Sequence, residues 1–166
     1  MDVVKLGPVF PDTMFKQLKD TCYRQHKRFP YSDEFGRYGV INHDWKTLNV
    51  YTDWLIPAAR EIFKSETLLP SYSMFVHYEG EKANLMKHKD NNACTYTMDL
   101  CLYQKTPWGL IVEGEEFMME PNEALCFYGE DQEHWRNEFP DPDVNEVGQV
   151  FFHFVEPDHW FFNEKL

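Results

Sequence analysis

The sequence has little that would suit a membrane, a secretory route or a nucleic acid. Among its 166 residues no apolar run approaches the ~20 residues of a membrane span. The first residues, Met1, Asp2 and Val3, lack the basic and apolar regions of a signal peptide. The formal net charge is −12, so the basic surplus that nucleic acid binding requires is missing as well. We therefore expect a cytoplasmic protein without a membrane partner, and the charge disfavours nucleic acid as a ligand.

Cysteine is scarce, and its spacing offers no CxxC pair. Three of the four cysteines lie in apolar or β-like runs; the four are Cys22, Cys94, Cys101 and Cys126. We expect reduced, buried thiols rather than disulfides or a zinc site. No internal repeat, linker or low-complexity segment divides the chain. With 43% hydrophobic and 17% aromatic residues, residues 1–166 are expected to form one compact domain.

The N-terminal part, residues 1–70, has mainly helical patterns. A short strand at Val3–Leu6 is followed by a predicted helix that begins at Asp12 or Thr13 and ends near Arg28. A second helical pattern covers residues 47–66, where Pro57 must open the helix or kink it. Residues 29–46 between them form an aromatic loop or hairpin, which either shapes a substrate mouth or completes the core. We expect these helices to buttress a sheet.

From Ser71 onward the pattern changes to short β-like segments separated by turns. In residues 149–155 the period of two places Gln149, Phe151 and His153 on one face, and the opposite, Phe-rich face should pack against helices. Residues 95–104 alternate in the same way. There we expect Asp99 to face solvent, with burial in a polar cavity as the alternative.

The most informative residues are His88 and Asp90, followed much later by His134. Two imidazoles and one carboxylate suit Fe(II), because they fill one face of an octahedron and leave three positions for O2 and a co-substrate. An HxD pair alone is a weak signal, but here it has a setting of strands and turns. A strand-like segment ending at Tyr78 and a turn at Gly80 precede the pair, and residues 124–128 form a strand that leads to His134.

This order resembles the 2-oxoglutarate/Fe(II)-dependent oxygenases, in the prolyl-4-hydroxylase-like branch, over about residues 70–156. The family pattern is a Tyr-Gly turn, HxD, a long strand, a glycine, a proline-led strand and a final histidine. It is matched by Tyr78 and Gly80, His88 and Asp90, residues 95–104, Gly109, Pro121 and His134. The resemblance implies an α+β fold in which residues 71–166 form a double-stranded β-helix, a jelly-roll or cupin-like barrel. It also implies that His88, Asp90 and His134 bind Fe(II), with 2-oxoglutarate as co-substrate and O2 as oxidant.

One family feature is missing from this sequence. The family places a Lys or Arg about ten to fifteen residues after the final histidine, to pair with the far carboxylate of 2-oxoglutarate, and residues 137–164 contain neither. Arg136 is the best local candidate for this role, with Gln149 and His153 beside it. The alternative is that Arg136 lies at the surface, paired with Glu133 or Glu138. Tyr78 matches a family tyrosine that hydrogen-bonds the co-substrate, or else it lies at the rim.

The resulting hypothesis is a hydroxylase that acts on a small molecule or a protein side chain. The acidic charge favours a cationic molecule or a basic peptide as substrate. One alternative is another mononuclear iron or copper enzyme on the same barrel, with a different co-substrate or none. A second alternative is a non-catalytic cupin-like binding module with incidental histidines. Because His26 and His43 stand alone in the sequence, we predict that the chemistry lies entirely after Tyr72.

Overall fold

The structure is a computed structural model that describes residues 2–28, 37–41 and 46–163. Its helices are α1 (Asp12–Arg28), α2 (Asn49–Phe63) and α3 (Trp160–Asn163). Its strands are β1 (Val4–Leu6), β2 (Arg37–Ile41), β3 (Leu69–Glu79), β4 (Tyr96–Gln104), β5 (Leu110–Val112), β6 (Glu115–Phe117), β7 (Ala124–Phe127), β8 (His134–Trp135) and β9 (Glu146–Val155). Single 3-10 turns occupy Lys46–Leu48 and Asn92–Cys94.

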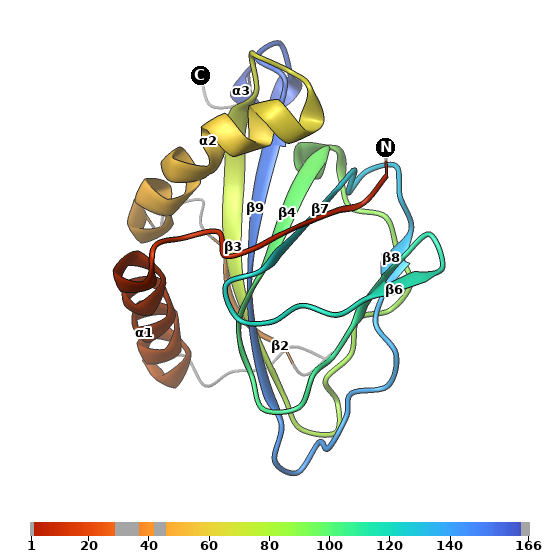
Figure 1. Ribbon diagram of the computed structural model, residues 1–166. Coiled ribbons are helices and arrows are strands. Elements are labelled where there is room, and N and C mark those ends of the chain that lie inside the picture. Colours follow the sequence, from red (N-terminus) through yellow and green to blue (C-terminus); the bar gives the residue numbers. More distant parts are fainter. Residues whose placement is uncertain (1, 29–36, 42–45, 164–166) are drawn as a thin grey trace.

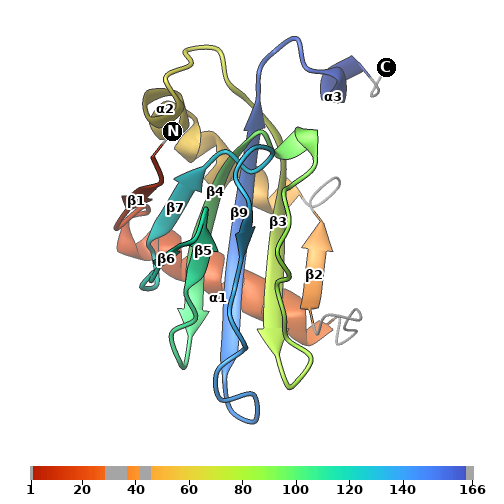
Figure 2. The same cartoon turned by 90° about the vertical axis from the view of Figure 1, so that its right-hand side faces the viewer.

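The strands form two antiparallel sheets. The large sheet has the order β1-β7-β4-β9-β3-β2, which can be followed from left to right in Figure 2, and the small sheet has the order β6-β5-β8. Figure 1 shows α1 and α2 on one side of the large sheet and the small sheet on the other. The predicted α+β class is confirmed, although the N-terminal part does more than buttress the sheet. Its strands β1 and β2 extend both edges of the large sheet by pairing with β7 and β3.

The outer face of the large sheet packs against the helices. Alternate residues of the central strands, among them Met98, Leu100, Phe152 and Phe154, are fully buried there. They contact apolar residues of α1 and α2 such as Leu18. Each fully buried side chain of this size contributes ~1.5–3 kcal/mol to folding. The prediction that the Phe-rich face of the last strand packs against helices is therefore confirmed.

The inner face of the large sheet encloses a second core with the small sheet. Its apolar residues include Val76, Tyr78, Trp108 and Val147. Asp99 lies on this inner side, fully buried, so the prediction that it faces solvent is wrong. The reason is that the sheet is covered on both faces, and alternation along a strand cannot tell which covered face is polar.

Other local predictions have mixed outcomes. The four cysteines are free and buried, as expected. Pro57 lies inside α2 rather than in its first turn. Most of the aromatic segment, including His43, lies outside the described residues. Within the described part of the chain, no helix combines the length and apolarity needed to span a membrane.

Candidate metal centre

His88 and His134 are held side by side by their own backbones. The His88 amide donates to the His134 carbonyl at 3.1 Å, and the His134 amide donates back to the His88 carbonyl at 2.9 Å. This isolated antiparallel bridge lies beside β8, whose His134 also pairs with Val112 of β5. The two imidazole centroids are consequently 4.3 Å apart, with ring planes inclined at 55°. Two residues far apart in sequence therefore reach one place through backbone hydrogen bonds.

The hydrogen bonds of each ring leave its Nε2 atom available. His88 donates from Nδ1 to the Met86 carbonyl at 2.7 Å, and His134 donates from Nδ1 to the Gln132 carbonyl at 3.0 Å. A carbonyl only accepts, so the proton of each neutral ring is assigned to Nδ1. Both Nε2 atoms then carry a lone pair, which is the tautomer that a metal ion needs.

Asp90 completes the group, with one oxygen equidistant from the two imidazoles. Its Oδ1 atom lies 3.5 Å from Nε2 of His88 and 3.6 Å from Nε2 of His134. Ligand atoms ~2.1 Å from one octahedral ion and at right angles to each other are ~3 Å apart, so a small contraction would suffice. The Asp90 amide donates to the Gly129 carbonyl at 2.9 Å. A Cβ atom on Gly129 would lie 2.5 Å from Oδ2 of Asp90, so this position requires glycine.

The charges within this cluster are those of a cation site. Burial alone disfavours the Asp90 carboxylate, but its interactions with His134 and His88 outweigh burial and hold the pKa of Asp90 well below its usual range. The adjacent Asp90 carboxylate raises the pKa of His88, which burial partly opposes. The predicted residues His88, Asp90 and His134 thus converge with a carboxylate that stays ionised and two imidazoles that face it. Nitrogen and oxygen donors of this kind fit iron, and the arrangement leaves one side open.

Arg136 lies in the barrel interior beside this group rather than at the surface. Its side chain is fully buried and lies 3.1 Å from the equally buried Asp99 carboxylate. It also donates from Nη1 to the Trp108 carbonyl, and its guanidinium lies over the Trp108 ring. The alternative pairing with Glu133 or Glu138 is therefore wrong. Burial raises the pKa of Asp99 to about 6, although Arg136 opposes this effect.

Gln149, His153 and Tyr78 line the same interior. Gln149 is 1% exposed, and neither its amide oxygen nor its amide nitrogen has a hydrogen-bond partner among the described residues. The His153 ring is buried, and its Nδ1 atom lies 3.2 Å from the Tyr72 carbonyl oxygen. Burial lowers the pKa of His153 to about 4. Tyr78 is 1% exposed and packs edge-on against Trp108 at 5.1 Å, so it does not lie at an exposed rim.

Several solved structures share this architecture over nearly the whole chain. A prolyl-4-hydroxylase from Pseudomonas putida aligns over 93% of this chain and 92% of its own, with a TM-score of 0.65 and 15% identity. A viral collagen prolyl hydroxylase from Paramecium bursaria Chlorella virus-1, solved with 2-oxoglutarate, aligns over 92% and 94%, with a TM-score of 0.67 and 9% identity. EctD from S. alaskensis, solved with bound Fe, aligns over 96% and 78%, with a TM-score of 0.71 and 12% identity. This chain has the fold of the 2-oxoglutarate/Fe(II)-dependent oxygenases.

The oxygenase fold confirms the predicted double-stranded β-helix and the prolyl-4-hydroxylase-like resemblance. No protein-family model and no curated protein matches the sequence. The likeness is therefore one of architecture.

A second histidine–carboxylate group lies on the opposite side of the large sheet, under α1. It consists of His26 from α1 with His77 and Glu79 from β3. The rings of His26 and His77 stack at a centroid distance of 3.6 Å, with their planes 13° apart. The prediction that His26 stands alone is therefore wrong. His77 alternates with Val76 and Tyr78 along β3 and so lies on the helix-facing side of the sheet, and nothing in the sequence spacing indicated that α1 would bring His26 onto it.

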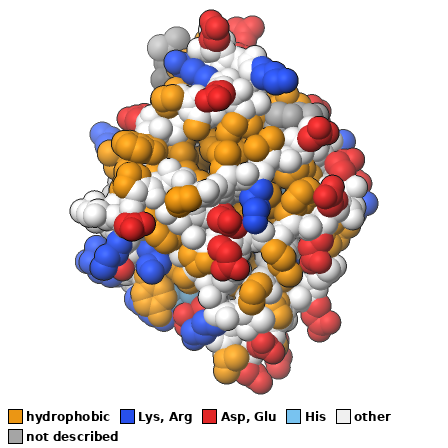
Figure 3. All heavy atoms as spheres, in the orientation of Figure 1, with side chains coloured by type: hydrophobic (Ala, Val, Ile, Leu, Met, Phe, Trp, Pro, Cys, Tyr) orange, Lys and Arg blue, Asp and Glu red, His pale blue; other side chains and the backbone are white. Residues whose placement is uncertain are grey.

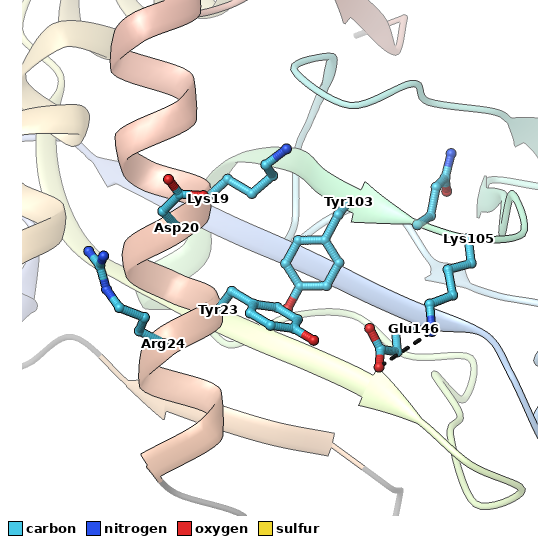
Figure 4. A pocket seen from close by; sticks show the side chains of 8 residues that line it. Lys19, Asp20, Tyr23, Arg24, Tyr103, Lys105 and Glu146 are labelled. Atoms are coloured by element: carbon cyan, nitrogen blue, oxygen red, sulfur yellow. Dashed lines mark ion pairs between the residues drawn. The ribbon is translucent and has the colours of Figure 1, made fainter.

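Two of the cavities formed by the described residues lie beside these two groups. A cavity of about 180 Å³ opens beside His88 and is lined by Arg37 and residues 84–88. A larger one, of about 470 Å³, lies on the outer side between α1 and the ends of β4 and β9, where Tyr23 meets Tyr103 (Figure 4). Figure 3 shows basic side chains over α1 at the left and acidic ones gathered at the right. Of these two, only the cavity beside His88 has a residue of the metal group in its lining.

Proposed function

We propose that this protein is a non-haem Fe(II) oxygenase that uses 2-oxoglutarate and O2 to hydroxylate its substrate. The observation that carries the proposal is the convergence of His88, Asp90 and His134. Two reciprocal backbone hydrogen bonds fix the imidazoles, both Nε2 atoms are unprotonated, and the carboxylate oxygen is equidistant from them. An incidental pair of histidines would not require this combination of tautomer and position.

Each residue of the group has a distinct task in this proposal. His88, Asp90 and His134 would hold Fe(II), which when bound supplies the oxygen-activating chemistry coupled to decarboxylation of a 2-oxoacid. The carbonyls of Met86 and Gln132 keep the imidazole protons on Nδ1 and so orient the ligand nitrogens. The side chain of His134 is 5% exposed and that of His88 is 37% exposed. Substrate access from the His88 side, with water excluded on the His134 side, follows from this asymmetry.

The co-substrate would lie deeper in the barrel, with its far carboxylate on Arg136. A carboxylate removed from water costs several kcal/mol unless a charged partner is provided. Arg136 supplies a permanently charged, planar donor two residues after His134. The unpartnered amide of Gln149 lies within the same buried interior, and His153 and Tyr78 complete its polar lining. This arrangement would replace the basic residue that the family pattern places further along the chain.

The substrate class is the coarsest part of the proposal. A cationic small molecule or a basic peptide segment suits a chain with a formal net charge of −12. The 180 Å³ cavity beside His88 would receive the group to be hydroxylated. The prolyl hydroxylases among the similar structures act on protein side chains or collagen according to their names, which supports a peptide as one of these options.

A second candidate is a mononuclear metal enzyme on the same barrel with another co-substrate. It is favoured by one observation, namely that the charge of Arg136 is already balanced by Asp99. Turnover assays would separate the two candidates, because only the 2-oxoglutarate enzyme forms succinate.

The decisive experiment is an anaerobic titration of the protein with Fe(II) and then 2-oxoglutarate. We expect the weak visible charge-transfer band of the metal-bound 2-oxoacid to develop with one equivalent of each. Asp90→Ala should show no band, and Asp143→Asn, an exposed carboxylate elsewhere, should behave as wild type. If Fe(II) binds but no band forms and no succinate appears under air, the second candidate replaces the first. If no Fe(II) binds, the first candidate fails, and of the second only a copper enzyme on the same barrel remains.

A further inference from the structure

The buried ion pair of Arg136 and Asp99 has polar atoms without a hydrogen-bond partner among the described residues. Both side chains are fully buried and the charged groups are 3.1 Å apart. Among the described residues, Oδ1 of Asp99, Nε of Arg136 and both amide atoms of Gln149 have no hydrogen-bond partner. Leaving such a buried polar atom unpaired is unfavourable, and more so when the group is charged. Several unpaired atoms on three neighbouring polar side chains indicate a place for a polar ligand.

An anionic ligand in this place meets a conflict of charge. The guanidinium that would bind its carboxylate already holds the Asp99 carboxylate, and the pair has no net charge. Two carboxylates on one buried cation lie within a few ångströms of each other and cannot both stay ionised. One of them must leave or accept a proton.

The neighbours of Asp99 determine whether Asp99 or the carboxylate of the ligand loses its charge or its place on Arg136. Its charged and titratable neighbours are Arg136 and His134 from the β8 segment, Asp90 from the loop before β4, and Cys101 on its own strand. On the flanking strands β7 and β9 its register partners are Leu125 and Phe151, which are apolar. Arg136 is therefore the permanent positive charge next to Asp99 within the described chain, and a second anion on Arg136 removes that compensation.

Resting on the proposed function, we propose that Asp99 is the positioning residue that controls co-substrate binding by giving up Arg136 to the incoming carboxylate. In the free protein Asp99 holds Arg136. On binding, the far carboxylate of 2-oxoglutarate takes the guanidinium, and Asp99 accepts one proton from solvent and becomes a neutral hydrogen-bond donor. The balance is one proton taken up for each dianion bound, and the sum of the charges of Arg136, Asp99 and the bound carboxylate remains zero.

Two observations make this exchange feasible near neutral pH. Burial raises the pKa of Asp99 to about 6 while Arg136 is still its partner, so loss of that partner raises it further. The Gln149 amide, unpartnered and buried on the adjacent strand β9, offers both a donor and an acceptor to the rearranged groups. A purely structural ion pair would need neither feature, and it would bind no proton when 2-oxoglutarate enters.

The test is calorimetric titration of the anaerobic Fe(II)-loaded protein with 2-oxoglutarate at pH 7.5, in two buffers that differ in ionisation enthalpy. We expect an uptake of about one proton per 2-oxoglutarate, and an affinity that weakens by about tenfold per pH unit above the pKa of Asp99. Asp99→Asn, which is neutral at every pH, should take up no proton through this site. It should bind 2-oxoglutarate about tenfold to thirtyfold more tightly at pH 7.5. Asp143→Asn makes the same chemical change at an exposed position and should match wild type.

The outcomes separate this inference from the proposed function. Binding without proton uptake, together with an Asp99→Asn variant that binds no more tightly, overturns the role of Asp99 and leaves the oxygenase proposal standing. If the wild-type protein binds Fe(II) but no 2-oxoglutarate, both are overturned. Should Asp99→Asn fail to fold, the wild-type protein still decides the matter. A protonated-carboxyl band that appears in its infrared difference spectrum on co-substrate binding supports the exchange, and its absence overturns it.

Discussion

Two of the histidine–carboxylate groups among the described residues have the same composition and opposite character. One comprises His88, Asp90 and His134 at the barrel interior, and the other comprises His26, His77 and Glu79 under α1. In each, the potential ligand atoms lie within 4.8 Å of one another. Only in the first do the imidazoles keep their protons on Nδ1 and direct both Nε2 atoms at one carboxylate oxygen.

The outer group uses its nitrogens differently. His77 donates from Nε2 to Glu79 at 3.0 Å and accepts from the Tyr103 hydroxyl at Nδ1, 2.8 Å away. Its rings are nearly parallel and stacked, so one ion cannot lie in the planes of both. Burial, with the neighbouring His77 adding to it, lowers the pKa of His26 to about 4. The comparison teaches that the tautomer and the ring plane, rather than residue type and proximity, distinguish a metal site from a packed polar cluster.

The largest effect should come from removing a ligand of the inner group. His134→Ala takes away one of three donors and should weaken Fe(II) binding by more than ~100-fold, because even loss of an outer-shell partner costs 10–100-fold. His26→Ala removes the equivalent imidazole of the outer group and should still bind one equivalent of Fe(II). Metal content after dialysis measures both variants. The assignment of the metal site to the inner group is wrong if His26→Ala loses the metal or His134→Ala retains it at wild-type affinity.

The second effect concerns the buried cation on the inner side. Arg136→Ala should weaken 2-oxoglutarate binding by roughly 2–5 kcal/mol, the cost of leaving a buried charge unpaired, with Fe(II) affinity nearly unchanged. Gln149→Ala and His153→Ala should lower the co-substrate affinity more modestly. Anaerobic titrations of the metal-loaded variants supply the numbers. An Arg136→Ala protein with wild-type co-substrate affinity would place the anchor elsewhere.

Much of this arrangement could be predicted from sequence because it depends on local patterns. The period of two separated the Phe-rich face of β9 from the face that carries Gln149 and His153, because side chains alternate along a strand. The HxD pair and His134 were found through ligand chemistry and the order of strands and turns. The N-terminal helix α1 was predicted within a residue at its start, because an acidic cap and an apolar stripe determine it locally.

What escaped prediction depends on contacts between distant segments. Asp99 was expected to face solvent, because nothing within its strand indicates that Arg136, from another sheet, will neutralise it. The stacking of His26 on His77 depends on how α1 crosses the outer face of the sheet, which no periodicity encodes. The need for glycine at position 129 likewise appears only when Asp90 is folded against it.

A third effect, on stability, should distinguish the outer group by pH. The unfolded chain protonates His26 near its usual pKa of 6.5, whereas the folded protein does so only near 4. The neutral, buried form therefore stabilises the fold fully above pH 6.5, and this contribution is lost as the pH falls from 6.5 towards 4. At pH 5 the loss is about 2 kcal/mol for His26, and His153, with the same shift, adds a similar amount.

Urea unfolding at pH 7.5 and at pH 5 measures this difference. His26→Phe retains a ring that can stack on His77 and should remove the roughly 2 kcal/mol of pH-dependent loss that His26 contributes. His159→Phe, at a partly buried histidine near the C-terminus, is the control and should leave the loss unchanged. If His26→Phe retains the full pH dependence, His26 is not the residue that resists protonation.

The smallest effect tests whether the two groups are independent across the sheet. Tyr103→Phe keeps the ring that packs over Gly148 but deletes the hydroxyl that donates to His77. The loss of this one neutral hydrogen bond should lower the free energy of unfolding by about 1 kcal/mol. Tyr23, whose ring packs edge-on against Tyr103, also lines the 470 Å³ cavity. Tyr23→Phe is therefore the control for loss of a hydroxyl and should lower the free energy of unfolding less than Tyr103→Phe.

Fe(II) and 2-oxoglutarate affinities should stay at wild-type values in both variants, because Tyr103 faces the helices and the metal group faces the small sheet. A Tyr103→Phe protein with weakened metal binding would show instead that the outer histidines position β3 for the inner site.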